Sequence, residues 1–246
     1  MKRKLSSIVV ALVFAASACA QEVTVHVRGG DRPPDSEFLY VARGQAQATT
    51  PGSIIVTGGA TVDKFQIVLR NVRLQAEPID GGSVDSPGAA IIGPNGYLVD
   101  LSGSSLAGGA FTPLVEHGSM GAKGFSEMDI DLSPVTDADI TAQPELSPLA
   151  GRTFEITGHN LGGVPFTIQS TVGVVLPRQS VFRMGLNHNN LDINIEPNRW
   201  FATPDGGTLD PASIDPAVRS QIEQNVLDSI DAYEDDDMDG NPDPLG

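Results

Sequence analysis

The stretch Leu191–Glu196 reads LDINIE and alternates apolar with polar residues without a break. An alternation with a period of two is typical of a β-strand that has one apolar face and one polar face. We therefore expect its three apolar side chains to face a core and its three polar side chains to face water. Because one face of such a strand meets solvent, the pattern favours an antiparallel sheet.

Similar alternation recurs along most of the chain. In Val23–Arg28, valines alternate with polar residues, and His26 is expected to point outward. From Phe65 onward the alternation changes phase at Arg70-Asn71, which predicts an inserted bulge residue. The remaining expected strands lie at Tyr97–Leu101, Met128–Leu132, Phe154–Ile156, Phe166–Ile168, Val172–Leu176 and Phe182–Leu186.

Turns rich in Gly, Pro and Ser separate these strands, and no helical periodicity lies between them. Many short strands in this arrangement predict an all-β fold over residues 19–203, an antiparallel β-sandwich of the Ig-like or transthyretin-like kind. Residues 133–150 contain prolines and little periodicity, and we interpret them as a surface connection. The alternative is that they divide the sandwich into two small subdomains.

The first residues have the pattern of an export signal. The basic residues Lys2–Lys4 precede an apolar run that ends in small residues, so residues 1–18 are expected to be a signal peptide. Cys19, the one cysteine of the chain, stands where a bacterial lipoprotein carries its lipid. The surrounding residues also fit cleavage before Gln21, so lipidation of Cys19 and simple cleavage both remain open.

The composition limits the partners and the sources of stability. Among 246 residues, 31 are acidic and 15 are basic, which gives a formal net charge of −16. No basic surface is available to offset a phosphate backbone, so nucleic acid is excluded as a partner, whereas cations are attracted. With a single cysteine the chain forms no internal disulfide, so its stability must come from a core, to which a bound metal can add.

Residues 204–246 are acidic and contain one helical pattern. Asp215-Pro216 predicts an N-cap followed by proline in the first helical turn. Apolar residues then recur at spacings of four and three, which predicts an amphipathic helix of about 18 residues that packs against the sandwich. This apolar stripe consists of Val218, Ile222, Val226, Ile230 and Tyr233.

The helical pattern runs into the sequence DDDMDGNPD, which begins at Asp235. Asp235, Asp237 and Asp239 match positions 1, 3 and 5 of an EF-hand loop, where carboxylates converge on Ca²⁺. Gly240 matches the glycine at position 6, which permits the sharp turn. These spacings predict a calcium site, and the alternative is a solvated acidic tail.

The same nine residues resemble the D-x-D-x-D-G-x-x-D calcium sites of thrombospondin-type-3-like and dockerin-like repeats. The resemblance implies that the carbonyl of Asn241 is the backbone ligand and that Asp243 acts directly or through water. Position 12, a bidentate Glu in EF-hands, is Gly246 in this chain. We therefore expect a lower affinity unless another carboxylate takes part.

Catalytic motifs are missing from the sequence, which contains no His-Glu-x-x-His helix, no G-x-G-x-x-G after a strand and no Walker loop. We therefore expect no enzymatic activity. One alternative is a glycan hydrolase with an unassigned pair of carboxylates. A second alternative is an envelope protein that handles copper or another metal, because imidazole and thioether groups are both suitable copper ligands. Its candidate ligands are His26, His117, His159 and His188 with Met120, Met128 and Met184.

The order of several short segments along the chain carries a resemblance to a known group of proteins. The segments are Trp200-Phe201, GTLDP at Gly207–Pro211, a helical segment with Asn225, AYEDDDMDG at Ala232–Gly240 and, earlier, Ile67–Leu74 and Tyr97–Leu101. In this order they resemble uncharacterised exported bacterial β-sandwich lipoproteins, some of which carry domains of unknown function. The resemblance implies a location and a fold and carries no established reaction.

Together these features predict an exported cell-envelope protein with a binding or structural role. We expect an outer-membrane lipoprotein or, without the lipid, a periplasmic or secreted protein. Its expected partners are a divalent cation and, through the lipid on Cys19, a membrane. A protein or glycan partner is not identified by the sequence.

Overall fold

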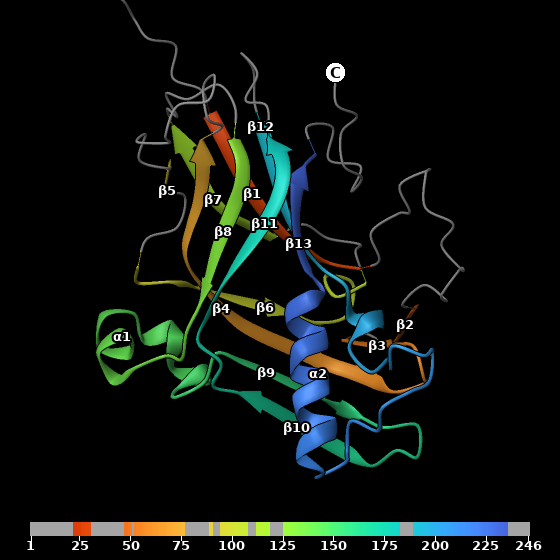
Figure 1. The fold of residues 1–246 in the computed structure, drawn as a ribbon. Helices are drawn as coiled ribbons and strands as arrows, with labels where there is room; N and C mark the ends of the chain where they lie inside the picture. The colour runs from red at the N-terminus through yellow and green to blue at the C-terminus, as the bar shows by residue number, and fades with distance from the viewer. Residues whose placement is uncertain are drawn as a thin grey trace, which may run out of the picture.

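Two β-sheets share one apolar core (Figure 1). The computed structural model describes residues 22–30, 47–50, 52–76, 89–90, 94–107, 112–118, 125–182 and 189–235. One sheet has four strands, and the other has nine strands arranged around the long strand β4 (Thr61–Ala76). The predicted all-β sandwich with one C-terminal helix is confirmed.

The four-stranded sheet brings together the two ends of the described chain. Its strands are β1 (Glu22–Gly29), β7 (Thr112–Gly118), β12 (Asn189–Ile195) and β13 (Ile230–Glu234). Strand β1 pairs with β7 in antiparallel and with β12 in parallel orientation, and β12 pairs with β13 in antiparallel orientation. A parallel pair needs a long crossover, which the chain between β1 and β12 supplies.

The nine-stranded sheet is built on β4, whose first half pairs with β9 and β6 and whose second half pairs with β8. The change occurs at Asn71, which has a positive φ of 43°, and the register against β8 shifts between Arg70 and Arg73. The predicted bulge is therefore confirmed. The strands of this sheet are β2 (Gln47–Thr50), β3 (Ser53–Ile55), β4 (Thr61–Ala76), β5 (Ala89–Ala90), β6 (Tyr97–Leu101), β8 (Phe125–Leu132), β9 (Phe154–His159), β10 (Pro165–Ser170) and β11 (Val174–Phe182).

The core lies between the two sheets and continues under the long helix. Leu191, Ile193 and Ile195 of β12 are fully buried, as their alternation predicts. They belong to the same apolar cluster as the inward residues of β8 and β4. At the helix end of this cluster, the ring of Trp200 lies 4.9 Å from the ring of Phe65.

The helix α2 (Pro216–Asp228) begins where the sequence predicts. Asp215 is its N-cap, and the Asp215 carboxylate accepts a 2.8 Å hydrogen bond from the backbone N–H of Ala217. Ile222 and Val226 are fully buried, so the helix packs on the sandwich in front of β9 and β10 (Figure 1).

The helix ends earlier than its apolar stripe predicts. Residues Ile230–Glu234 form β13 instead of a last helical turn. Over so short a segment Ile230 and Tyr233 fit a helical spacing, while Ile230 and Ala232 fit a strand. The segment forms a strand because it can pair with the edge of β12. This pairing provides hydrogen-bond partners for its backbone N–H and C=O groups and buries Ile230 and Ala232 in the shared core.

Residues 133–150 connect β8 to β9 and also carry structure of their own. They form α1 (Asp137–Ala142) and the 3₁₀ helix η1 (Pro144–Leu149). A second, smaller apolar cluster lies beneath them and consists of Val68, Val135, Leu146 and Leu149. The interpretation as a plain surface connection was therefore incomplete, since these residues cover part of β4.

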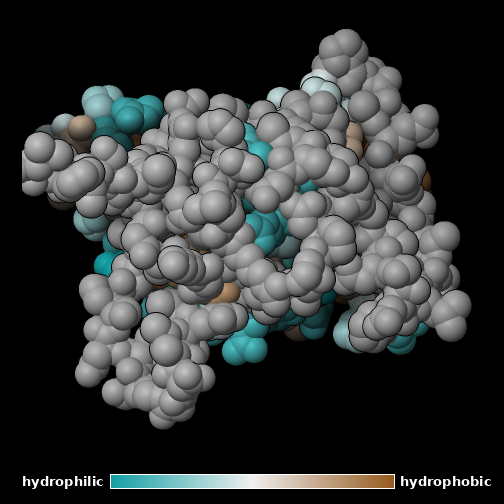
Figure 2. All heavy atoms as spheres, turned by 90° about the horizontal axis from the view of Figure 1, so that it is seen from above, coloured by the Kyte–Doolittle hydropathy of each residue, from teal (hydrophilic) through white to brown (hydrophobic). Residues whose placement is uncertain are grey.

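The described part of the surface is more polar than apolar in the view from above. Figure 2 views the molecule from above, and the described atoms in view are predominantly hydrophilic. Within the described ranges, the helices are all too short or too polar to span a bilayer.

Candidate functional site

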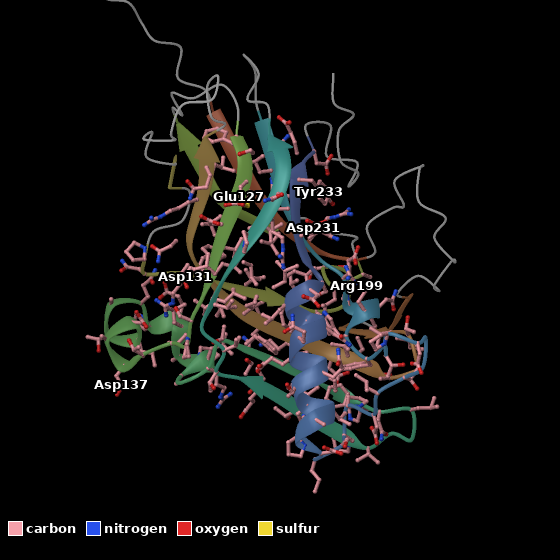
Figure 3. The ribbon with its side chains drawn as sticks, in the orientation of Figure 1. Glu127, Asp131, Asp137, Arg199, Asp231 and Tyr233 are labelled. Atoms are coloured by element: carbon pink, nitrogen blue, oxygen red, sulfur yellow. The ribbon has the colours of Figure 1, made fainter. Side chains whose placement is uncertain are left out.

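A buried row of polar side chains lies on the face of the four-stranded sheet that points away from the shared core. We name it the polar row, and it consists of His26, Arg28, Asp192, Asn194, Tyr233 and Asp235. Each of these residues is 7% exposed or less. The register explains the grouping, because His26 lies opposite Asp192 in β1–β12 pairing, and Asp192 lies opposite Tyr233 in β12–β13 pairing. Figure 3 shows Tyr233 and Asp231 on β13.

The burial of this row corrects the expectation that the polar faces of β1 and β12 meet water. Asp192 is 1% exposed and Asn194 is fully buried. His26, which was expected to point outward, is 6% exposed. Alternation reveals that the two faces of a strand differ in polarity, but it contains no information on what covers the polar face.

Asp192 lies at the centre of the row. Its Oδ1 is 3.7 Å from His26 Nδ1 and its Oδ2 is 3.9 Å from Arg28 Nε, both beyond hydrogen-bonding distance. Both of its carboxylate oxygens are buried, and neither accepts a hydrogen bond from a basic side chain or a backbone N–H of the described chain. A buried carboxylate to which no N–H donates is costly in its charged form, which favours the protonated carboxyl group.

An acidic partner of Asp192 is Asp235, the residue that follows β13. Asp235 is fully buried, and its backbone N–H donates a 3.0 Å hydrogen bond to the carbonyl of Asn190, which extends the β12–β13 ladder by one step. Burial raises the pKa of Asp192, and the charge of Asp235 and its hydrogen bond with Asp192 raise it further, whereas the charge of Arg28 lowers it. Two carboxyl groups can share a hydrogen bond only when one of them is protonated.

Burial also keeps two neighbours of this pair neutral. It lowers the pKa of His26, which favours the uncharged imidazole, and it raises the pKa of Tyr233 above the ordinary value of a phenol. The side chain of Arg28 forms a hydrogen bond with Tyr233. Within the polar row the fixed positive charge is therefore that of Arg28, which faces two carboxyl groups.

Of the predicted calcium ligands, Asp235 lies in the described part of the chain. Asp237, Asp239, Asn241 and Asp243 lie outside the described residues, as does the predicted lipidation site Cys19. Among the residues that the structure does describe, no group of three or more His, Cys, Asp or Glu side chains is arranged to hold a metal ion. The calcium loop stays a prediction, and Asp235 is the one predicted ligand whose surroundings the structure describes.

The alternative His/Met metal site is not assembled by the described residues. His26 is buried in the four-stranded sheet, whereas His159 is the last residue of β9 in the other sheet. The Nδ1 atom of His159 lies 3.2 Å from Oδ2 of Asp63. Met128 is fully buried in the apolar core. The backbone of His117 lies in β7, while Met120, Met184 and His188 fall outside the described residues.

Sequence reasoning missed the pairing of Asp192 with Asp235 and the inclusion of His26, Arg28 and Tyr233. The signal that could have found them was the concentration of charged residues on the polar faces of β1 and β12. It becomes informative only once these two strands are known to be neighbours, which their distance in the chain hides. Comparison with known proteins adds no further assignment, because no protein-family model, curated protein or solved structure matches the chain.

Proposed function

We propose that this protein is an exported, lipid-anchored module of the cell envelope that binds Ca²⁺ through its C-terminal acidic loop and serves in binding or scaffolding without catalysis. The observation that carries the calcium proposal is the position of Asp235. The first predicted ligand is fully buried, and its backbone is held by Asn190 at the end of the sheet.

A fixed first ligand favours cation binding for two reasons. Less conformational freedom remains to be lost when the loop closes around the ion, and hard oxygen ligands at positions 1, 3 and 5 match the preference of Ca²⁺. An ion that binds only the folded chain also stabilises it by mass action. We therefore propose that calcium ties the C-terminal segment to the four-stranded sheet.

Isothermal titration of the full chain with Ca²⁺ tests this proposal. The parent protein should release or absorb heat and saturate at one ion, whereas Asp237→Ala and Asp239→Ala should bind at least about tenfold more weakly because each removes a charged ligand. Asp228→Ala is the matched control, since it removes an acid from the end of α2 and leaves the loop intact. A parent protein without calcium heat would end the proposal.

The anchor is tested separately by mass spectrometry of the N-terminus after expression in a bacterial envelope. Diacylglyceryl on Cys19 supports the lipid anchor, and an unmodified chain that begins at Gln21 contradicts it. Either result leaves the calcium measurement unaffected.

The glycan-hydrolase alternative gains no support from the carboxylate pair of the polar row. A glycosidase needs two carboxyl groups that touch the scissile bond and leave room for the sugar. Asp192 is 1% exposed and Asp235 is fully buried, so a sugar does not reach either one in this arrangement.

A further inference from the structure

We infer that a polar pocket between α2 and the chain that follows the 3₁₀ helix η2 (Pro197–Arg199) binds a small zwitterion, an amino acid of about the size of alanine. The pocket has a volume of about 150 Å³ and opens to solvent. Its lining residues are Arg199, Ala202, Thr203, Pro204, Asn225 and Asp228. None of these residues is a proposed calcium ligand, so the inference goes beyond the proposed function.

Hydrogen bonds fix the shape of the pocket before any ligand binds. The Nδ2 atom of Asn225 donates to the carbonyl oxygens of Trp200 and Ala202, at 3.0 and 2.7 Å, and so ties α2 to the opposite wall. The backbone N–H of Thr203 donates a 3.0 Å hydrogen bond to the carbonyl of Gly207, which closes the turn that continues this wall. A preformed pocket loses little conformational entropy when a ligand binds, so more of the interaction energy appears as affinity.

Two opposite charges line the pocket from different elements. Arg199 is the last residue of η2, Asp228 is the last residue of α2, and Figure 3 shows Arg199 beside this end of the helix. Arg199 Nη1 lies 3.1 Å from a carboxylate oxygen of Glu196, and Asp228 Oδ1 accepts a 2.9 Å hydrogen bond from Gln224. Among the described residues, Arg199 and Asp228 form no ion pair with each other. The other guanidinium nitrogens and Asp228 Oδ2 are therefore available to a ligand.

This arrangement of charges favours a ligand that carries both signs. A carboxylate group suits Arg199, because a guanidinium group donates charge-assisted hydrogen bonds to it. An ammonium group suits Asp228, because the C-terminal end of a helix adds partial negative charge to that of the carboxylate. A simple anion would be repelled by Asp228, and a simple cation by Arg199 and by Arg178, whose charge lies close to both residues. A zwitterion forms both ion pairs and leaves the net charge unchanged.

The volume limits the size of the ligand. A cavity of about 150 Å³ accommodates about six non-hydrogen atoms, as a bound benzene ring shows. Alanine and β-alanine have this size, and the methyl group of Ala202 and the ring of Pro204 line the pocket beside their carbon atoms. Because Arg199 and Asp228 are also in contact with water, each ion pair contributes little, and we expect a dissociation constant in the millimolar range.

Titration of the isotope-labelled full chain with L-alanine and with β-alanine, followed by two-dimensional NMR, tests the inference. We expect at least one of the two probes to cause saturable shift changes at the residues that line the pocket. Propionate lacks the ammonium group of these probes, and ethylamine lacks the carboxylate. Each should bind at least about tenfold more weakly, because it leaves one of the two charged residues without a partner.

Substitutions then assign the two contacts. Arg199→Gln and Asp228→Asn should each weaken binding of the amino acid by about tenfold or more, while the thermal unfolding temperature stays close to that of the parent, because both side chains are at the surface. Arg152→Gln is the matched control, since Arg152 also pairs with a glutamate three residues away, Glu155, but does not line the pocket. It should bind within about twofold of the parent.

Three results would overturn the inference. The first is a parent protein whose pocket resonances do not respond to either amino acid well above millimolar concentration. The second is binding of propionate or ethylamine as tight as that of the amino acid, which would show that one charge suffices. The third is unchanged binding in both Arg199→Gln and Asp228→Asn, which would place the ligand elsewhere. All three leave the calcium titrations of the proposed function unaffected.

Discussion

The guanidinium Nη2 of Arg178 donates a 2.7 Å hydrogen bond to the carbonyl oxygen of Leu227 in the last turn of α2. Its Nε donates a second hydrogen bond to the carbonyl of Ile230, where β13 begins. The last carbonyls of a helix have no partner within the helix and carry partial negative charge. Arg178 therefore ties β11 to the point at which the chain changes from helix to strand.

We expect Arg178→Met to lower the free energy of unfolding by about 2–3 kcal/mol, because it leaves carbonyls at the helix end without a charged donor. Urea denaturation followed by circular dichroism measures the change. Arg199→Met is the control, since Arg199 is half-exposed and its ion pair with Glu196 should contribute less than about 1 kcal/mol. Equal losses in both variants would contradict the prediction.

The ion pair between Arg70 and Asp139 predicts a dependence of stability on pH. Both terminal nitrogens of the Arg70 guanidinium group donate to the Asp139 carboxylate, at 3.0 and 2.8 Å. These hydrogen bonds, and further bonds from Thr136, lower the pKa of Asp139 to about 2. Because the folded pKa is depressed, the contribution is complete above the ordinary pKa of 3.8 and is lost as the pH falls from about 4 to about 2.

Asp139→Asn should therefore cost about 1 kcal/mol at pH 7, and the difference from the parent should shrink toward zero near pH 2. Denaturant titrations at several pH values measure both quantities. Asp137→Asn is the control, since it removes an acid from the same turn of α1 and leaves the Arg70 contact in place. A difference from the parent that stays constant from pH 7 to pH 2 would show that the ion pair is not its source.

Gly158 on β9 is required by a close backbone approach. A Cβ at this position would lie 2.0 Å from the carbonyl oxygen of Thr61 on β4. Gly158→Ala must therefore displace one of two paired strands, and we expect a loss of at least about 2 kcal/mol in unfolding free energy. Gly173→Ala places the same methyl group where nothing lies within 4 Å and should change stability by less than about 0.5 kcal/mol. A Gly158→Ala protein as stable as the parent would refute this requirement.

Trp200 joins the aromatic core to the end of α2. Its Nε1 donates a 2.8 Å hydrogen bond to Ser229 Oγ, and both residues are fully buried. Trp200→Phe removes this bond and leaves a void, so we expect a loss of about 2 kcal/mol, whereas Ser229→Ala keeps the ring and should cost about 1 kcal/mol. Thermal unfolding followed by circular dichroism ranks the three proteins. A reversed ranking would show that leaving the buried Trp200 N–H without an acceptor costs more than the void left by the smaller ring.

Local patterns in the sequence predict much of the fold. The strand with a buried apolar face at Leu191–Ile195, the bulge at Asn71 and the cap at Asp215 are each confirmed, because each depends on residues that are neighbours in the chain. The predicted extension of α2 through Tyr233 was wrong for the opposite reason. Its outcome depends on the edge of β12, which lies far away in sequence and offers backbone partners that a helix would not use.

The sequence by itself determined the β-rich class, the acidic surface and the C-terminal run of aspartates, since these follow from residue type and spacing. Only the tertiary structure placed Asp192 beside Asp235 and buried His26 next to them. The physical reason is that strand pairing acts between distant segments, while a side chain's exposure depends on all that packs around it. A periodic pattern identifies the polar face of a strand, but only the tertiary fold determines whether that face is exposed to water.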